Sequence, residues 1–204
     1  MVKVAVLVSG GGTNLQALID AEKRGELGCG KLSLCVASSE KAYAMTRAEN
    51  YGIKTVVVAK RAYADINDYA EVLLDILRSE DIELIVLAGF LTILPTEVIA
   101  QYRDRILNVH PSLIPSFCGE GFYGLKVHEA ALAYGVKVTG ATVHMVSEVV
   151  DGGRILLQKA VDIQPEDTPE TLQKRVMQQA EWQLLPQATA LLCNDIAREK
   201  ETKI

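Results

Sequence analysis

The sequence predicts an α/β fold, with an open, mostly parallel, twisted sheet and helices on both of its faces. Two observations lead to this prediction. Apolar runs of strand length alternate with segments in which apolar residues recur every three or four positions. Several of these runs are apolar almost throughout, as expected for strands that are buried on both faces. Strands joined through helices form right-handed crossovers, which produce parallel pairs.

Up to Pro111 the predicted elements alternate regularly along the chain. Each strand is predicted from an apolar run, and each helix from the apolar spacing that follows it. Glycines or prolines stand at several boundaries, where they favour turns. The expected strands are residues 2–8, 32–37, 54–58, 82–88 and 105–110. The expected helices follow the glycines after Val8, span residues 42–51 and 65–78, and begin again after Pro95.

The rhythm changes after Pro111. A loop with proline and glycine covers residues 111–124, and a helix is expected over 125–134. Strands over 136–146 and 154–161 flank an Asp-Gly-Gly turn, and we expect these C-terminal strands to pair antiparallel.

A closing helical segment is predicted over residues 168–197. Pro186 should kink or break it, because proline removes a helix hydrogen bond and crowds the preceding turn. Residues 198–204 should form a frayed tail. Since no repeat or linker divides the sequence, residues 1–204 are expected to form a single domain.

The composition is typical of a soluble cytoplasmic protein. The net charge is −5 and no long run of one sign occurs, which argues against a nucleic-acid partner. The N-terminal apolar run has only strand length and lacks the flanks of a signal peptide or membrane span, so no membrane partner is expected. The cysteines show no C-x-x-C spacing, so we expect reduced thiols at Cys29, Cys35, Cys118 and Cys193.

A glycine-rich loop, SGGGTN, joins the first predicted strand to the first predicted helix. Such a turn exposes backbone N–H groups at a helix N-terminus, where they bind anions. Leu15 stands where the dinucleotide fingerprint has its third glycine, and no lysine follows to make a nucleoside triphosphate loop. The loop therefore favours a single phosphate group over a purely structural turn.

Asn108 and His110 lie two residues apart in the strand that Pro111 ends. Residues two apart share a strand face, so both side chains should point the same way at the carboxyl end of the strand. Ligands of open parallel sheets bind at that end. An amide that stabilises an oxyanion and an imidazole that transfers a proton suit carbonyl chemistry. The alternative is a hydrogen-bonded core histidine, but the pairing favours catalysis.

Three further polar residues have less certain roles. His128 lies on a predicted helix and is interpreted as structural, while His144 either lines the site or packs beneath it. The spacing of the three histidines matches no zinc motif, so no metal is predicted. Asp151 is either a turn residue or a carboxylate that reaches His110 and favours its protonated form.

Four segments together resemble the folate-dependent formyltransferases: SGGGTNLQ, LAGFLTILP, NVHPSLIP and HMVSEVVDGG. The resemblance covers residues 2 to about 192. The NVHPSLIP and DGG segments are specific to the superfamily, whereas the glycine loop and the chain length point to the branch that formylates glycinamide ribonucleotide. The resemblance implies a Rossmann-like formyltransferase fold.

The resemblance also implies a role for each candidate residue. Asn108 would bind the formyl oxygen and His110 would be the acid/base group, while Asp151 would raise the His110 pKa and relay a proton. Glu181 would lie near the substrate amine, unless it is only an exposed helix carboxylate. The ribose phosphate would be held by Gly12, Thr13 and Asn14 with Gly11 beside them, and the folate by Leu91, Thr92, Ile93, Leu94 and Asn108.

The implied reaction transfers a formyl group from the co-substrate 10-formyltetrahydrofolate to the amine of glycinamide ribonucleotide, a step of purine biosynthesis. It needs no metal and no nucleic acid, and the protein would be a monomer or homodimer. Thr92 and Ile66 stand where many relatives carry basic residues, which leaves the anchoring of the folate glutamate tail open. Segment 116–126 is longer than in some relatives, so the rim of the site should differ.

Three other functions are weighed against this one. A methionyl-tRNA formyltransferase would need a further domain and a basic surface. A formyltetrahydrofolate deformylase would carry an N-terminal regulatory domain, whereas the first strand here is expected to begin at Val2. A non-catalytic binding module would not need Asn108, His110 and Asp151 together.

Overall fold

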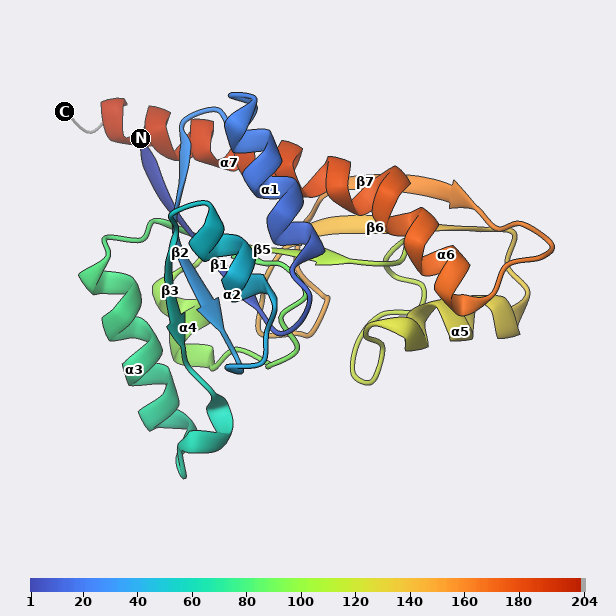
Figure 1. Cartoon of the computed structure of the whole chain (residues 1–204), viewed down its shortest axis with the longest axis horizontal. Helices are drawn as coiled ribbons and strands as arrows, with labels where there is room; N and C mark the ends of the chain where they lie inside the picture. The colour runs from blue at the N-terminus through green and yellow to red at the C-terminus, as the bar shows by residue number, and fades with distance from the viewer. Residues whose placement is uncertain (203–204) are drawn as a thin grey trace.

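The computed structural model describes residues 1–202 and contains a seven-stranded sheet in the order β3-β2-β1-β4-β5-β6-β7 (Figure 1). The first five strands pair in parallel, and β6 and β7 pair antiparallel with their neighbours. The predicted fold class is therefore confirmed, including the antiparallel C-terminal strands. The strands are β1 (Val2–Val8), β2 (Gly30–Ala37), β3 (Lys54–Val57), β4 (Leu84–Leu87), β5 (Ile106–His110), β6 (Val138–Met145) and β7 (Ile155–Asp162).

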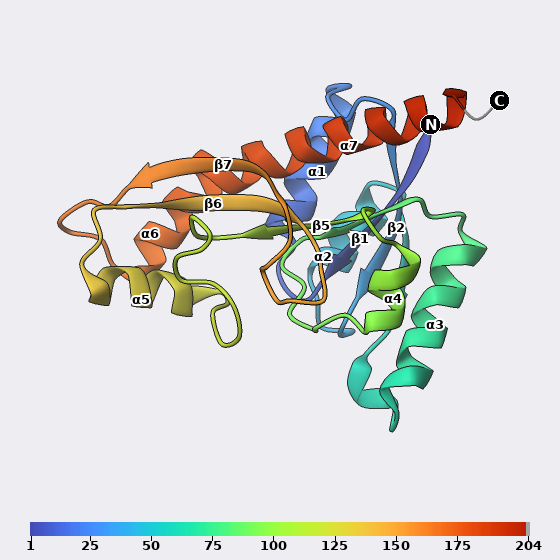
Figure 2. The same cartoon turned by 180° about the vertical axis from the view of Figure 1, so that it is seen from behind.

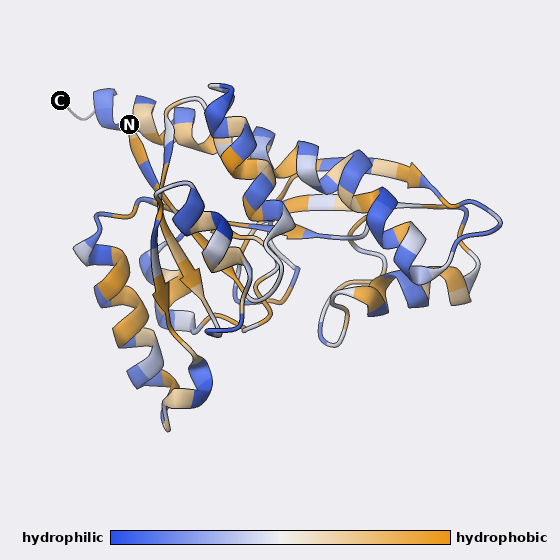
Figure 3. Cartoon of the chain, in the orientation of Figure 1, coloured by the Kyte–Doolittle hydropathy of each residue, from blue (hydrophilic) through white to orange (hydrophobic). Residues whose placement is uncertain are grey.

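Helices cover both faces of the sheet, as Figures 1 and 2 show from opposite sides. One buried apolar cluster joins the sheet to α1 (Thr13–Lys23), α2 (Ala44–Asn50) and α7 (Trp182–Thr202). A second cluster joins the other face to α3 (Ile66–Ser79) and α4 (Thr96–Gln101). In Figure 3 the central strands are largely hydrophobic, which agrees with burial from both sides.

The remaining elements lie in the C-terminal half and in one connection. α5 (Leu125–Tyr134) contacts α6 (Pro169–Val176), which continues through a π-helical turn, Met177–Glu181, into α7. A short 3-10 turn, Lys60–Ala62, precedes α3. Side-chain caps stabilise the N-termini of α3 and α6. Asp65 accepts a hydrogen bond from the Asn67 N–H at 2.8 Å, and Thr168 forms a capping box with Thr171.

The C-terminal helical segment differs from its prediction in two respects. The helix is not broken at Pro186, which lies inside α7. A π-helical turn, Met177–Glu181, precedes α7. The expected frayed tail is wrong for residues 198–202, which are helical and held by ion pairs of Glu199 with Arg105 and of Lys200 with Glu83. Residues 203 and 204 lie outside the described residues.

The order of the strands in the sheet determines where the site lies. β1 is flanked by β2 on one side and by β4 on the other, so the connections after β1 and β4 leave the sheet at a topological switch point. β6 runs antiparallel to β5, and this register sets His144 directly opposite Asn108 and Thr142 opposite His110. Side chains from the chain's middle and its C-terminal half therefore meet at the carboxyl end of β5.

Candidate active site

A cleft of about 800 Å³ opens at the carboxyl ends of β1, β4 and β5. This volume lies within the range of small-molecule sites. All of the residues predicted for the site line this one cleft, although they come from distant parts of the chain. They are Gly11, Gly12, Thr13 and Asn14 after β1, Leu91, Thr92, Ile93 and Leu94 after β4, Asn108 and His110 on β5, and Asp151 and Glu181 beyond it.

The glycine loop presents donors that have no acceptor within the protein. Among residues 1–202, the backbone N–H groups from Gly10 to Asn14 find no hydrogen-bond partner. α1 begins at Thr13 without a side-chain cap, so its first N–H groups are also free. Gly12 has a φ of 72°, and a Cβ there would lie 2.6 Å from the Ala44 Cβ, so only glycine fits.

Asn108 is held in place by its cross-strand neighbour, His144. The His144 Nδ1–H donates to its neighbour's carbonyl, Met145 O, at 2.9 Å, because a carbonyl oxygen can only accept. In the neutral ring His144 Nε2 is therefore an acceptor, and the Asn108 Nδ2 amide donates to it at 3.1 Å. This bond and a longer one to Asp151 Oδ1, at 3.5 Å, orient the amide, so that both of its N–H groups have partners in this structure. His144 thus lines the site and positions Asn108, which settles the alternative that the sequence left open.

Asp151 lies among the catalytic candidates. Its Oδ2 accepts from the Gly119 N–H at 2.9 Å and lies 3.5 Å from His110 Nδ1. Its Oδ1 lies 3.5 Å from both His144 Nε2 and Asn108 Nδ2. Burial favours the neutral carboxyl, but the neighbouring imidazoles of His144 and His110 and the Gly119 N–H outweigh burial, so the Asp151 pKa is lowered and a carboxylate is maintained.

His110 is buried, with one ring nitrogen hydrogen bonded and the other 3.5 Å from Asp151. Its Nε2–H donates to the Phe117 carbonyl at 2.9 Å, which leaves Nδ1 facing Asp151. Phe117 has a left-handed φ of 49°, and this unusual backbone belongs to the loop that brings its carbonyl to the histidine. The loop is tied to β6 through Thr142 Oγ1, which donates to Ser112 O at 2.7 Å.

His128 differs from the other two histidines. It is fully buried on α5, lines the cleft, and neither ring nitrogen finds a partner among residues 1–202. Burial, and next the charge of His110, lower its pKa to about 4. The imidazole is therefore neutral at neutral pH, and His128 cannot supply a positive charge to the site.

Glu181 ends the π-helical turn and reaches the glycine loop. Its carboxyl accepts a bond from Asn14 Nδ2 at 2.7 Å, across 167 residues of sequence. It is buried rather than exposed, so the alternative of a surface carboxylate is wrong. Burial raises the pKa of Glu181 to about 7, although the bond from Asn14 opposes this shift. The carboxyl is therefore able to exchange a proton near neutral pH.

The segment after β4 forms an apolar edge of the cleft. Leu91 and Ile93 are about three-fifths exposed (62% and 61%), whereas Leu94 is buried beneath them. Ser9 Oγ accepts from the Leu91 N–H at 2.9 Å and from the Ser38 hydroxyl at 2.8 Å, so the glycine loop and this apolar edge are joined directly. Exposed leucine and isoleucine at a cleft suit a flat apolar ligand.

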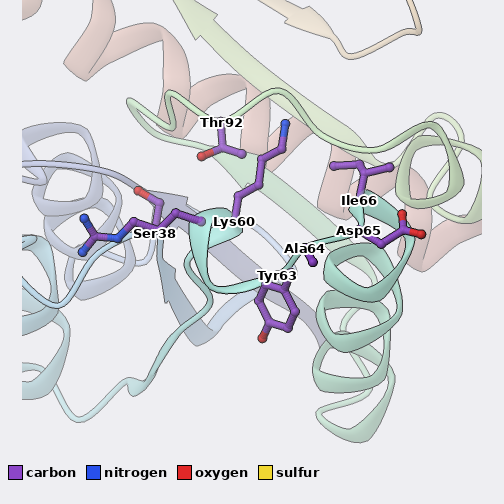
Figure 4. A pocket seen from close by; sticks show the side chains of 8 residues that line it. Ser38, Lys60, Tyr63, Ala64, Asp65, Ile66 and Thr92 are labelled. Atoms are coloured by element: carbon purple, nitrogen blue, oxygen red, sulfur yellow. The ribbon is translucent and has the colours of Figure 1, made fainter.

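A second pocket, of about 580 Å³, adjoins the cleft at Thr92, which lines both. Figure 4 shows Lys60 extending toward Thr92, with Ile66 and Asp65 on the opposite wall. Lys60 and Arg61 both line this pocket, and within residues 1–202 neither side chain makes a hydrogen bond or ion pair. The Asp65 carboxylate is engaged as the cap of α3. The pocket therefore carries two free positive charges.

Comparison with known proteins identifies the family. The model of the formyl transferase family matches residues 2–189. The chain belongs to this family. A phosphoribosylglycinamide formyltransferase of Haemophilus influenzae is 38% identical over 186 residues, which cover 91% of this chain and 84% of the relative. A chloroplastic phosphoribosylglycinamide formyltransferase of Arabidopsis thaliana is 38% identical over 201 residues, covering 98% of this chain and 68% of the relative.

Solved structures of the same family have the same fold. Glycinamide ribonucleotide transformylase 1 of Symbiobacterium toebii matches with a TM-score of 0.89 at 34% identity, covering 96% of this chain and 89% of that one. Other formyl transferase relatives are longer: the chain spans 61% of a chloroplastic enzyme of Vigna unguiculata and 18% of a trifunctional purine biosynthetic protein of Gallus gallus.

Sequence reasoning missed several groups of this formyl transferase site. The Phe117 carbonyl and the Gly119 N–H are backbone atoms, which leave no signature in residue identity. The His144–Asn108 bond depends on the β5–β6 register, which the sequence did not predict. The direct link from Ser9 to Leu91 was also missed. In the sequence, only the serine that follows β1 could have indicated this hydrogen bond.

Two absences among residues 1–202 bear on the kind of site. No three or more histidine, cysteine, aspartate or glutamate side chains gather in a position to hold a metal ion together. No helix has the length and apolar character needed to cross a membrane.

The raised pKa of Glu181 predicts a pH-dependent stability. A carboxyl whose pKa is raised on folding, here to about 7, stabilises the fold at low pH, and this stabilisation is lost as pH rises from the unfolded value through the folded one. Glu181→Gln keeps the shape without the ionisation. Thermal unfolding at pH 5 should therefore be similar for both proteins, whereas at pH 8 the variant should be more stable by about 2 kcal/mol. Equal differences at both pH values would contradict a buried, titrating carboxyl.

Proposed function

We propose that this protein transfers the formyl group of 10-formyltetrahydrofolate to the amine of glycinamide ribonucleotide, a step of purine biosynthesis. The observation that carries the proposal is the meeting of Asn108, His110 and Asp151 in the same cleft as an unpaired anion-binding loop. The names of the relatives support the same substrates. The chain would carry the whole reaction in one domain, residues 1–204, using formyl folate as co-substrate and no metal.

The acceptor would lie between the glycine loop and Glu181. Its phosphate would accept hydrogen bonds from the free N–H groups of Gly11 to Asn14 at the N-terminus of α1. The Glu181 carboxyl, which bonds to Asn14, would hold the amine end. The pterin ring of the donor would lie on the apolar edge formed by residues 91–94, so that its formyl group approaches Asn108.

The reaction then follows from the position of these groups. The amine nitrogen attacks the formyl carbon, a C–N bond forms, and the carbonyl electrons move to oxygen. An N–H of the Asn108 amide would stabilise this oxyanion, which would replace Asp151 Oδ1 as its acceptor. As the bond from carbon to N10 breaks, a proton passes to N10 and another leaves the attacking amine. The products are formylglycinamide ribonucleotide and tetrahydrofolate.

His110 and Asp151 would carry the protons. The His110 Nε2–H is bonded to Phe117 O in this structure, so a substrate atom would replace that carbonyl as the acceptor. The Asp151 carboxylate faces Nδ1 and favours the imidazolium that forms during transfer. The Asp151 carboxylate would accept a proton from the ring and later return it, and its lowered pKa means that the proton would not stay on the carboxyl.

We further propose that the protein acts in the cytoplasm as a monomer or homodimer, with small molecules as its partners and no nucleic acid or membrane. All four cysteines are unpaired, which is compatible with a reducing compartment. The net charge of −5 gives no basic surface for a nucleic acid.

A formyl-transfer assay tests the function. Mixing the protein with 10-formyltetrahydrofolate and glycinamide ribonucleotide should consume the formyl folate, and Asn108→Ala should lower kcat by about 100- to 1000-fold, as for loss of an oxyanion donor. Asn50→Ala, an exposed change on α2, is the matched control and should leave kcat unaltered. Consumption without the nucleotide would point to a deformylase. Binding of both ligands with no turnover would point to a binding module.

The pocket beside Thr92 bears on how the folate tail is anchored. We propose that Lys60 and Arg61 bind the glutamate carboxylates, in place of the basic residues that many relatives have at positions 66 and 92. The supporting observations are that both cations are free and that their pocket adjoins the apolar edge of the cleft at Thr92. A single exposed ion pair contributes little binding free energy. A tail with several carboxylates, however, can form ion pairs with both cations at once.

The variant Lys60→Ala/Arg61→Ala should raise KM about 5-fold for triglutamyl 10-formyltetrahydrofolate at low salt, and less for the monoglutamyl form. The rise in KM of the variant over the wild type should become smaller at higher salt, because salt screens the charges. The control Arg103→Ala/Lys137→Ala removes two exposed charges that line neither pocket. Equal KM values for wild type and variant with both tails would show that the tail is not bound here.

A further inference from the structure

The carbonyl oxygens of Gly10, Gly11 and Gly12 each accept a hydrogen bond, whereas the N–H groups of these residues have no acceptor within residues 1–202. Gly10 O accepts from the Ala44 N–H at 3.1 Å, and Gly12 O accepts from the Gln16 N–H at 2.9 Å. Between them, Gly11 O accepts from the guanidinium of Arg47, whose Nε lies 2.8 Å away. Two of these three donors are backbone groups, so Arg47 is the one side chain that fixes the orientation of the loop.

The orientation matters because a peptide has two polar ends. When successive carbonyls turn to one side, the N–H groups between them turn to the other and form a concave anion site. If the peptide after Gly11 were to flip, its carbonyl oxygen would point toward the anion and repel it. Gly10 and Gly11 have open space around them, so side-chain crowding does not prevent such a flip.

Arg47 is itself fixed firmly. Its Nη1 donates to Gln16 Oε1 at 3.0 Å, and its guanidinium lies 5.1 Å from the ring centroid of Tyr43. It does not line the cleft, so it would not touch the ligand. The start of α2 packs so closely against the loop that a Cβ on Gly12 would lie 2.7 Å from the Ala44 Cα. Arg47 is therefore held directly behind the loop, on the side opposite to the free N–H groups.

We propose that Arg47 is a positioning residue for the phosphate of the acceptor: it holds the Gly11 carbonyl away from the anion and places a positive charge behind the loop. This inference rests on the proposed function, in which the loop binds that phosphate. A guanidinium suits both tasks, because it keeps its charge and donates in fixed directions. Arg47, a residue of α2, thus raises the affinity for a phosphate-bearing substrate but takes no part in the reaction itself.

The test compares the nucleotide with its dephosphorylated nucleoside. Arg47→Ala should raise the KM for glycinamide ribonucleotide about 10-fold, the effect of losing one hydrogen bond to a charged group, with kcat and the KM for formyl folate unaltered. The KM for the nucleoside, which has no phosphate, should not change. Arg47→Lys keeps the charge but not the fork of donors, and should recover part of the affinity. Calorimetric titration with the nucleotide alone gives the same comparison without turnover.

Lys41→Ala is the matched control, because Lys41 is an exposed cation just before α2 and its side chain makes no bond to residues 1–202. Its KM values should equal those of the wild type. An equal rise for nucleotide and nucleoside in Arg47→Ala, or an equal rise in Lys41→Ala, would overturn the positioning role. So would unaltered nucleotide affinity in Arg47→Ala. If the wild-type protein bound no nucleotide, the proposed function would fail together with this inference.

Discussion

The site depends on one buried carboxylate. Asp151 lies against His110, His144 and the Asn108 amide, and it also accepts the Gly119 N–H. An unpaired buried charge would be strongly destabilising, so these contacts are what allow the carboxylate to remain there. In return they orient two imidazoles and an amide toward a single cleft. Without the charge of Asp151, each of these groups would lose one of the partners around it.

The backbone around Asp151 is built to hold it in place. Its φ of 55° is left-handed, a conformation that aspartate tolerates better than most residues. A Cβ on Gly153 would lie 1.8 Å from Met145 O, and one on Gly152 would lie 2.7 Å from a Val149 methyl. The two glycines therefore let the turn pack directly against the end of β6. Since Met145 follows His144, the same close contact sets the carboxylate beside the imidazole that orients Asn108.

Much of the fold could be predicted from the sequence, because burial produces regular patterns over short stretches. Alternation within β5 was enough to place Asn108 and His110 on one face, and the glycines after β1 were enough to predict an anion loop. The link between His110 and Asp151 could not be derived, because it depends on the β5–β6 register and on a distant turn. Backbone partners such as the Phe117 carbonyl have no residue signature. The helix is not broken at Pro186, and the π-helical turn that precedes α7 has no sequence signature that we used.

The most direct test of the central role of Asp151 is the kcat for formyl transfer by Asp151→Asn. Asparagine has nearly the same shape but no charge, so it should fold and bind both substrates with similar KM values. It should lower kcat by at least about 100-fold, because the carboxylate that lies 3.5 Å from His110 Nδ1 would be lost from the proposed proton transfer. A kcat within twofold of the wild type would contradict the account, since the carboxylate would then be only a turn residue.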